Sequence, residues 1–322
     1  MRHVPRVTVG LPVHNGEAFL SEAIESVLGQ TFEDLVLVVC DNASTDRTPE
    51  ILRRYRRQDP RVVVHRNEVN VGAAKNFNLA FELARGPLFR WMAADDILEP
   101  TCLERCVEVL DADRRVVLSH TDVEIVDGSG RVVEHFRYPP GHASSDSPSR
   151  RFLDVMRLDR WCAELFGLVR SDVLRTTRLM DGYVASDRVL RAELALRGRF
   201  QIVPEPLFLN RDHPGRSVRA LPAHHLRGEW FSPSLAGRRI LPHWRILTEY
   251  VRCIRRSPIS PAERRRCYAH TLRWLGIHAN WARLGADVVI AAWPASWESL
   301  WRASRAADGW LRAGGGQPRR DA

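Results

Sequence analysis

Apolar and polar positions follow two different periods along the first third of the chain. Short valine-rich runs, typical of buried strands, are separated by segments that repeat hydrophobic residues every three or four positions, as helices do. Strands and helices in alternation form right-handed crossovers, which produce a parallel sheet covered by helices on both faces. We therefore predict an α/β fold with strands at 7–13, 35–40, 62–65 and 87–93.

The pattern changes after the fourth strand and its helix. Alternation on both sides of a DGSG turn at 127–130 predicts a β-hairpin. The polar, turn-rich residues 139–150 predict a mobile loop, and residues 186–198 predict a helix that ends at a glycine. Residues 200–209 are predicted to be extended, and only helical patterns follow from about Pro222.

These patterns divide the chain into three segments. An α/β domain spans 1–220, a helical extension spans 221–312, and a tail spans 313–322. The tail is rich in glycine and polar residues, which predicts disorder. With 322 residues, of which 44% are hydrophobic, the chain is long enough to bury one large core.

Composition excludes several classes of protein. The formal charge is +9, but apart from Lys75 the cationic residues are all arginine, so we attribute the charge to a GC-rich genome and expect no nucleic-acid partner. The six cysteines show no CxxC pair and no zinc-ligand spacing, which predicts reduced thiols. The sequence has no signal-peptide pattern and no apolar run long enough to cross a membrane. We therefore expect a cytoplasmic protein.

Polar residues gather in the loops that follow the predicted strands. In a parallel sheet, ligands bind beyond the carboxyl ends of the strands. The DNASTD segment at 41–46 is dense in acids, amides and hydroxyls, although such residues also form capped turns, and that alternative stays open. The NVGAAKN segment at 70–76 opens a helix with a glycine and the lysine, a combination that favours an anion such as a phosphate.

Two neighbouring acids, Asp95 and Asp96, follow the fourth strand. Carboxylates at a strand end can share a divalent cation, and Mg2+ or Mn2+ held by one or two carboxylates completes its shell with water and substrate phosphates. The alternative is that Asp96 caps the following helix while Asp95 is merely solvated.

The segments LPVHNGEAFL, VVCDNASTD, NVGAAKN and WMAADD, in this order, resemble family 2 inverting glycosyltransferases with the GT-A fold. The resemblance covers about residues 5–215. It implies a Rossmann-like, mostly parallel central sheet flanked by helices, with the helical segment as a C-terminal extension. It also implies a UDP- or dTDP-sugar donor, an acceptor hydroxyl, for which a lipid-linked molecule is one option, and Mg2+ or Mn2+ as cofactor.

The resemblance assigns donor contacts to a set of strand-end residues. Asp41 and Asn42 contact the base or ribose, and the Asn42 amide, which stands where the family often has a second aspartate, can still accept the N3 hydrogen of uracil or thymine. The full implied set of nucleotide-sugar contacts is Pro12, His14, Asn15, Asp41, Asn42, Asn70, Gly72, Lys75, Asn76, Asp96 and Arg211.

The same resemblance implies a metal site and a base. Ala93 stands at the first acid of the family's D-x-D motif, and the last acid falls on Asp95, the implied metal ligand, together with His213 of NRDHPGRSV. Arg211 is expected to face the leaving diphosphate. In YVASDRVL, Asp187 matches the catalytic base, although an acid in the first turn of a helix also interacts favourably with the helix dipole. Trp161 and Glu164 are acceptor-side candidates, and Trp161 equally suits a place in the core.

Six of the ten tryptophans lie in the last fifty residues. Trp297, Leu300, Trp301 and Leu311 can share one face of a helix, with arginines beside it. Such a face suits the inner surface of an anionic membrane, and it equally suits packing on the α/β domain or on a second subunit. Both interpretations stay open.

The sequence therefore predicts a glycosyltransferase that acts in the synthesis of cell-surface polysaccharide, glycolipid or a glycosylated metabolite. The alternative is a nucleotide-sugar-binding protein of the same fold without turnover, which Ala93 favours. A nucleotidyltransferase is disfavoured, because no GxGxR loop lies near the N-terminus.

Overall fold

The structure, a computed structural model, describes residues 3–158, 162–221 and 224–292. It confirms the predicted alternation of strands and helices in the first third of the chain. The elements there are β1 (Val7–Val13), α1 (Leu20–Leu28), β2 (Leu35–Asp41), α2 (Thr48–Gln58), β3 (Val62–Arg66), α3 (Ala73–Glu82), β4 (Leu88–Trp91), β5 (Ile97–Leu98) and α4 (Cys102–Ala112).

The middle of the chain adds further strands and the helices that pack beneath the sheet. These elements are β6 (Val116–Val126), β7 (Val132–Phe136), α5 (Pro148–Arg157), the 3-10 turn η1 (Ala163–Phe166), β8 (Leu168–Arg170), α6 (Ser171–Arg175), α7 (Ser186–Arg197) and β9 (Arg199–Arg211). The predicted hairpin is confirmed, because β6 pairs antiparallel with β7.

The C-terminal segment is helical, as predicted. It contains α8 (Ser217–Ala220), α9 (His224–Phe231), η2 (Pro233–Leu235), α10 (Pro242–Arg256), α11 (Pro261–Trp274), η3 (Ile277–Ala279) and α12 (Asn280–Ala292). The expected tail at 313–322 and the tryptophan-bearing face at 297–311 lie outside the described residues.

The strands form one nine-stranded, mostly parallel sheet in the order β3-β2-β1-β4-β8-β6-β9-β5, with β7 paired to β6. β3, β2, β1 and β4 are mutually parallel, while β8 runs antiparallel between β4 and β6. β1 lies in the interior of this order, and all seven of its residues are buried, whichever face of the sheet they point to. This burial on both faces explains why its sequence is a continuous apolar run.

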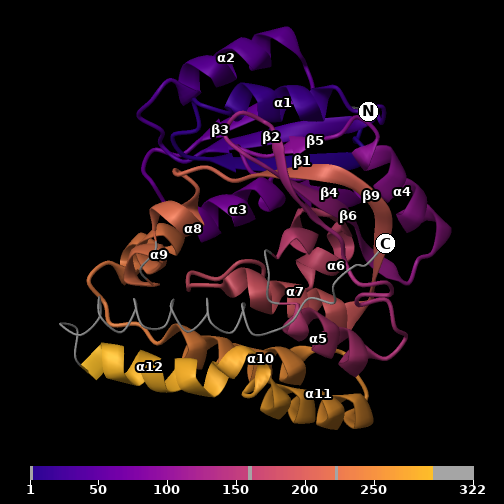
Figure 1. The fold of residues 1–322 in the computed structure, drawn as a ribbon. Helices are drawn as coiled ribbons and strands as arrows, with labels where there is room; N and C mark the ends of the chain where they lie inside the picture. The colour runs from indigo at the N-terminus through magenta and orange to yellow at the C-terminus, as the bar shows by residue number, and fades with distance from the viewer. Residues whose placement is uncertain (1–2, 159–161, 222–223, 293–322) are drawn as a thin grey trace, which may run out of the picture.

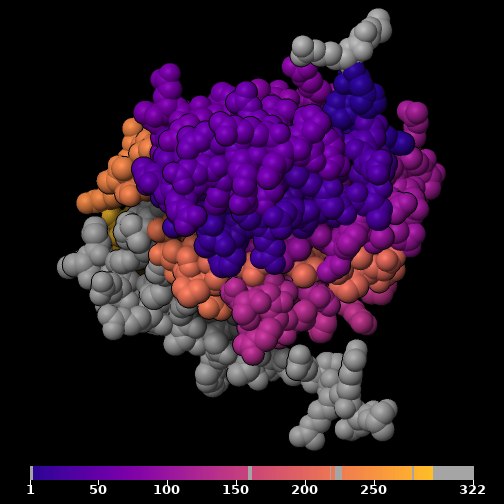
Figure 2. All heavy atoms as spheres, turned by 90° about the horizontal axis from the view of Figure 1, so that it is seen from above, coloured from indigo at the N-terminus to yellow at the C-terminus, as the bar shows by residue number. Residues whose placement is uncertain are grey.

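Helices cover both faces of the sheet (Figure 1). α1 and α2 lie on one face, whereas α3, α5 and α7 lie on the other, with α10, α11 and α12 as an outer layer beyond them. The outer layer packs closely, since Ile246, Tyr250 and Cys253 belong to the same hydrophobic core as Leu190 and Leu194 of α7. Seen from the α2 side, the first third of the chain forms a continuous surface (Figure 2).

Residues 139–147 lie in a loop, as predicted, but part of this loop packs against the rest of the protein. His142 and Ala143 are buried, and the chain enters α5 at Pro148, where the Ser147 side chain caps the helix by accepting a hydrogen bond from the Arg150 N–H. Polar, turn-rich composition did not reveal this packing, because the contacts come from distant segments such as Glu164 of η1.

The described residues include no helix that is long and apolar enough to span a membrane. All six cysteines are buried and unpaired. This agrees with the prediction of reduced thiols.

Candidate functional site

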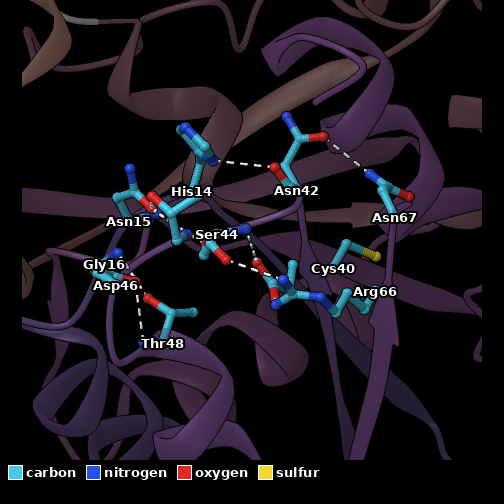
Figure 3. Close-up of polar contacts among 12 residues, drawn as sticks. His14, Asn15, Gly16, Cys40, Asn42, Ser44, Asp46, Thr48, Arg66 and Asn67 are labelled. Carbon is cyan, nitrogen blue, oxygen red and sulfur yellow. Dashed lines mark hydrogen bonds and ion pairs between the residues drawn. The ribbon is translucent and has the colours of Figure 1, made fainter. Parts of the chain in front are cut away.

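The loops after β1 and β2 are joined by hydrogen bonds at the carboxyl edge of the sheet (Figure 3). The Asn15 N–H donates to Ser44 Oγ at 2.9 Å and the Gly16 N–H donates to Thr48 Oγ1 at 2.9 Å. Asp46 also accepts from the Thr48 N–H at 3.0 Å, so this segment forms the capped turn that its composition allowed. The loop after β2 therefore supports the loop after β1.

Asp41, at the end of β2, is buried and only 1% exposed. Its Oδ1 accepts from the Ser44 N–H at 2.9 Å, and its Oδ2 is paired with the Arg66 guanidinium. Both carboxylate oxygens are thus engaged by groups of the protein itself.

A chain of amides connects the loops after β2 and β3. Asn42 Oδ1 accepts from Asn67 Nδ2 at 3.0 Å and from the Val71 N–H at 2.9 Å, and its Nδ2 donates to Asn70 Oδ1 at 2.8 Å. Asn67 also donates to Asn76 Oδ1 at 3.0 Å, and Asn76 in turn donates to the Cys40 carbonyl at 2.8 Å. The network holds Asn42 and Asn76 in buried positions and leaves Asn70 exposed.

The predicted donor residues of β1 and α3 differ in exposure. Pro12 is buried within β1, beside Cys40 of β2, whereas His14 and Asn15 are exposed directly after the strand. Gly72 precedes α3 with a φ of +85°, and a Cβ there would lie 2.7 Å from the Phe231 carbonyl oxygen. Only glycine suits this backbone conformation and this close approach. Lys75 is exposed in the first turn of α3.

Asp95 and His213 meet at this edge, as the sequence predicts for a shared cation site. His213 Nε2 lies 3.0 Å from Asp95 Oδ2, and the side chains are 16% and 29% exposed, respectively. Within the described residues no third histidine, cysteine or acid joins them. A carboxylate and an imidazole with open positions suit Mg2+ or Mn2+, which take their remaining ligands from water and phosphate.

Asp96 points away from this pair into the protein. Its carboxylate accepts from the Arg211 N–H at 2.9 Å and from Asn210 Nδ2 at 3.1 Å. Burial, followed by the neighbouring charge of Asp95, raises the pKa of Asp96 to about 7. The alternative that Asp96 caps the next helix is wrong, because β5 intervenes and α4 begins at Cys102 after Thr101.

Arg211 is only 2% exposed and is enclosed by protein groups. Its Nε donates to the Asp95 carbonyl at 2.9 Å, one terminal nitrogen donates to Glu22 at 2.6 Å, and the guanidinium lies 4.6 Å from the centre of the Phe19 ring. From the sequence, Arg211 is expected to face the leaving diphosphate, and the enclosure of its side chain does not agree with that position. Arg211 instead connects the backbone of Asp95 to α1.

Asp187 lies in the first turn of α7, where one of its oxygens, Oδ1, is buried without a hydrogen-bond partner among the described residues. The segment before this helix is tied to α3, because Asn78 accepts from the Met180 N–H at 3.0 Å and donates to the Met180 carbonyl at 2.7 Å. A Cβ on Gly182, like one on Gly72, would contact Ser232. α7 therefore begins close to the segment that also packs against Gly72.

A buried ion pair holds α7 against η1. Arg191 donates to both oxygens of Glu164 at 3.1 and 3.2 Å, and His142 Nε2 lies 3.0 Å from Glu164. Burial alone would raise the pKa of Glu164, but the Arg191 charge and His142 lower it to about 2. Glu164 is fully buried, so its carboxylate is not exposed to an acceptor in the way that the sequence predicts. Trp161, the other acceptor-side candidate, lies outside the described residues.

The sequence prediction does not include several residues that complete this edge. Arg66 is the last residue of β3 and Asn67 directly follows the strand, which is the same signal that selected the other loops. Glu22 carries no such signal, because an acid in the first turn of a helix resembles any solvated residue. Asn210 precedes Arg211 at the end of β9 and is recognisable only from its contact with Asp96.

The chain is similar in sequence to known glycosyltransferases. An uncharacterised glycosyltransferase of Methanocaldococcus jannaschii is 32% identical over 135 residues, which cover 41% of this chain and 47% of the relative. The chondroitin synthase of Escherichia coli is 30% identical over 136 residues, which cover 42% of this chain and 20% of the synthase. The matched part is thus less than half the length of each of these curated relatives.

Solved structures share the fold. The structure of S. aureus TarS 1-349 superposes with a TM-score of 0.61 at 16% identity, covering 89% of this chain and 80% of that one. The mannosyltransferase PcManGT of Pyrobaculum calidifontis gives 0.55 at 18% identity, covering 96% and 81%. These likenesses confirm the predicted GT-A fold. Residues 8–162, just under half of the chain, match the family described as glycosyl transferase family 2, and over these residues the chain is similar to that family.

Proposed function

We propose that the chain is a metal-dependent inverting glycosyltransferase that moves a sugar from a nucleotide-sugar donor to an acceptor hydroxyl. The observation that carries the proposal is the Asp95 and His213 pair, which lies at the same sheet edge as the loops after β1, β2 and β3. Two related folds support the donor class, because TarS has been solved with UDP-GlcNAc and PcManGT with GDP-Man and Mn2+.

The donor lies along the carboxyl edge of the sheet in this proposal. The loops after β1, β2 and β3 hold the nucleoside of a UDP- or dTDP-sugar, and the start of α3, with Gly72 and Lys75, faces the diphosphate. Backbone N–H groups at the start of a helix and a lysine both attract negative charge. Asp41 and Asn42 support these loops and do not contact the donor themselves, because their side-chain oxygens already accept hydrogen bonds from other groups of the protein.

Asp95 and His213 hold Mg2+ or Mn2+ in this proposal. The ion supplies positive charge that stabilises the departing nucleoside diphosphate. Arg211 contributes indirectly, since its bond to the Asp95 carbonyl and its pair with Glu22 keep the β4 loop in place.

Asp187 acts as the base. Its carboxylate takes the proton from the acceptor hydroxyl while the hydroxyl oxygen bonds to C1 of the sugar and the bond from C1 to the diphosphate oxygen breaks. Attack from the face opposite the leaving group inverts the configuration at C1. The unpaired, buried Oδ1 of Asp187 supports this role, since it has no competing partner among the described residues.

Acceptors in cell-surface polysaccharide, glycolipid or glycosylated-metabolite synthesis fit the family. The exposed side chains of Trp244 and Trp281, 41% and 67% exposed on α10 and α12, support contact of the C-terminal helices with the inner face of a membrane or with a second subunit. The alternative of a binding protein without turnover is favoured by Ala93 at the first position of the D-x-D motif.

A donor panel with Mn2+ tests the proposal. The protein should release nucleoside diphosphate from at least one nucleotide sugar, and Asp187→Asn should lower kcat by about 10²-fold or more without loss of donor binding. Asp181→Asn is the matched control, because Asp181 precedes the same helix and pairs with Arg178 and Arg245 on the surface. Binding without turnover in the unaltered protein would support the binding-protein alternative.

A further inference from the structure

The outer side of α12 is apolar. Its exposed positions are all tryptophan, alanine, glycine or valine, namely Trp281, Ala282, Gly285, Val288, Val289 and Ala292. Of its two charged residues, Arg283 is half-buried and Asp287 is buried, where it accepts a hydrogen bond from the His243 N–H at 2.7 Å. A surface helix normally presents charged and polar residues to water, so this side of α12 suits an apolar environment instead.

Helices α10 and α11 continue this surface. The indole N–H of Trp244 on α10 donates to the Leu284 carbonyl of α12 at 3.0 Å. The Trp281 N–H donates to the Leu275 carbonyl at 3.0 Å, just after α11, where Leu272 is 70% exposed. α10 packs against both α11 and α12, and the three form the outermost layer on the opposite side of the molecule from α1 and α2 (Figure 1). We call the exposed side of α10, α11 and α12 the outer surface.

The outer surface is also strongly basic. Every exposed charged residue whose side chain the structure describes between 224 and 292 is an arginine. The four acids in this range are all buried or half-buried, namely Glu229, Glu249, Glu263 and Asp287. The arginines share helix sides with the apolar residues, because the helical period places Trp244 and Arg255 on one side of α10, and Leu272 and Arg265 on one side of α11. The outer surface therefore combines apolar side chains with positive charge.

We propose that the outer surface binds the face of an anionic lipid bilayer. Tryptophan and valine side chains enter the boundary between headgroups and acyl chains, while the arginines pair with the anionic headgroups. A second copy of the chain matches this surface less well, because a two-fold contact would bring arginines of both copies together without an exposed acid among the described residues between them. A nucleic acid also matches it less well, because the exposed positions of α12 offer no charge to phosphates.

This inference deepens the proposed function and rests on it for the acceptor, because it identifies a lipid-linked molecule as the acceptor class. α10 packs against α7, whose first turn carries Asp187. Binding of the outer surface would therefore hold the base at a constant distance from the bilayer in which the acceptor is anchored.

Co-sedimentation of the full chain with lipid vesicles tests the inference. Vesicles of phosphatidylcholine are compared with vesicles in which about one third of the lipid is phosphatidylglycerol. The protein should partition at least roughly tenfold more strongly onto the anionic vesicles, and added salt should weaken this partition. Equal partition onto both kinds of vesicle, or no partition onto either, would overturn the inference.

Two double variants separate the apolar contribution from the charged one. Trp281→Ser combined with Val288→Ser should lower the partition onto anionic vesicles by roughly tenfold, and so should Arg255→Gln combined with Arg265→Gln. All four side chains are exposed, so the melting temperature should stay the same and shows that each variant is folded. Partition that survives either double variant would contradict a contact through the outer surface.

Matched controls lie elsewhere on the molecule. Arg53→Gln combined with Arg57→Gln removes two exposed arginines from α2, on the opposite side from the outer surface. Val133→Ser removes an exposed valine from β7. Both controls should leave the partition unchanged.

Other occupants of the outer surface give different results. A dimer that the Trp281 and Val288 double variant dissociates, in a protein that binds no vesicles, would assign the surface to a second copy. Tighter binding of a duplex oligonucleotide than of anionic vesicles would assign it to nucleic acid. Either result would overturn the inference.

Release of nucleoside diphosphate from a donor, measured in solution without vesicles, tests the proposed function separately. Turnover without vesicle binding would overturn the inference and leave the proposed function standing. Vesicle binding without turnover of any donor would leave the membrane contact standing, and would overturn the proposed function together with the acceptor class.

Discussion

His213 Nε2 lies 3.0 Å from Asp95 Oδ2, although 118 residues separate the two in sequence. The strand β9 brings His213 back to the sheet edge at which β4 ends, and the Phe19 ring packs edge-on against His213 at 4.7 Å. Both side chains of the pair are partly exposed.

Asp95→Asn should remove most of the dependence of donor binding on Mn2+. The amide lacks the negative charge that a divalent ion needs, so donor affinity in Mn2+ should fall by at least about tenfold. Titrations of UDP with and without Mn2+ measure the effect. Asp212→Asn serves as control, because Asp212 adjoins His213 but pairs with Arg219. Unchanged stimulation by Mn2+ in the Asp95 variant would contradict the assignment.

Arg211→Ala should destabilise the fold by about 3 kcal/mol, because it empties a buried position and removes the hydrogen bonds that the guanidinium donates. The Asp95 carbonyl and Glu22 lose their shared partner, and the Phe19 ring loses the guanidinium packed over it. Urea unfolding gives the free energy. Arg219→Ala, which removes an exposed ion pair, should cost no more than about 1 kcal/mol. Equal costs for the two variants would argue against Arg211 as a structural link.

Glu164→Ala should cost about 3–5 kcal/mol, since the buried Arg191 guanidinium would lose the carboxylate that accepts two of its hydrogen bonds. Thermal or urea unfolding measures this cost. Glu263→Ala is a useful comparison, because Glu263 caps the start of α5 from a more exposed position and should cost less. If Glu164→Ala cost less than Glu263→Ala, the ion pair between Glu164 and Arg191 would contribute little to the free energy of unfolding.

Glu164 also predicts how stability depends on pH. Its pKa is about 2 in the folded protein against 4.5 as the ordinary value, so the folded state favours the ionised form. The contribution is complete above about pH 5 and is lost as the pH falls through 4 toward 2. The melting temperature should therefore decline more steeply over this range in the unaltered protein than in Glu164→Gln. Parallel curves would contradict the prediction.

Gly72→Ala should lower stability by roughly 1–3 kcal/mol and weaken donor binding. The residue has a φ of +85°, and its new Cβ would lie 2.7 Å from both the Phe231 carbonyl oxygen and Pro233 Cδ. Gly237→Ala separates the two causes, because Gly237 has a φ of +65° with open space around it. If both variants lose the same stability and neither changes donor affinity, the close packing at Gly72 has no role in the site.

Most of the fold is predictable from local pattern. Strands β1 to β4, the hairpin of β6 and β7, helix α7 and the helical C-terminal segment all appear where periodicity and turn residues place them. Packing of the segment at 139–150 was not predictable, because it depends on His142 meeting Glu164, a contact between two elements with no shared pattern in sequence.

The sequence by itself determined which loops follow parallel strands and hence which polar segments gather at one edge of the sheet. Strand and helix periods are local properties, so they need no knowledge of distant contacts. Only the tertiary structure decided what each polar residue does there. Asp41, Asn42, Asp96 and Arg211 have partners from remote segments and are buried, whereas His14, Asn70 and Asp95 keep a side exposed. Burial and hydrogen-bond saturation arise from contacts across the fold, so residue type and spacing cannot distinguish a supporting side chain from a binding one.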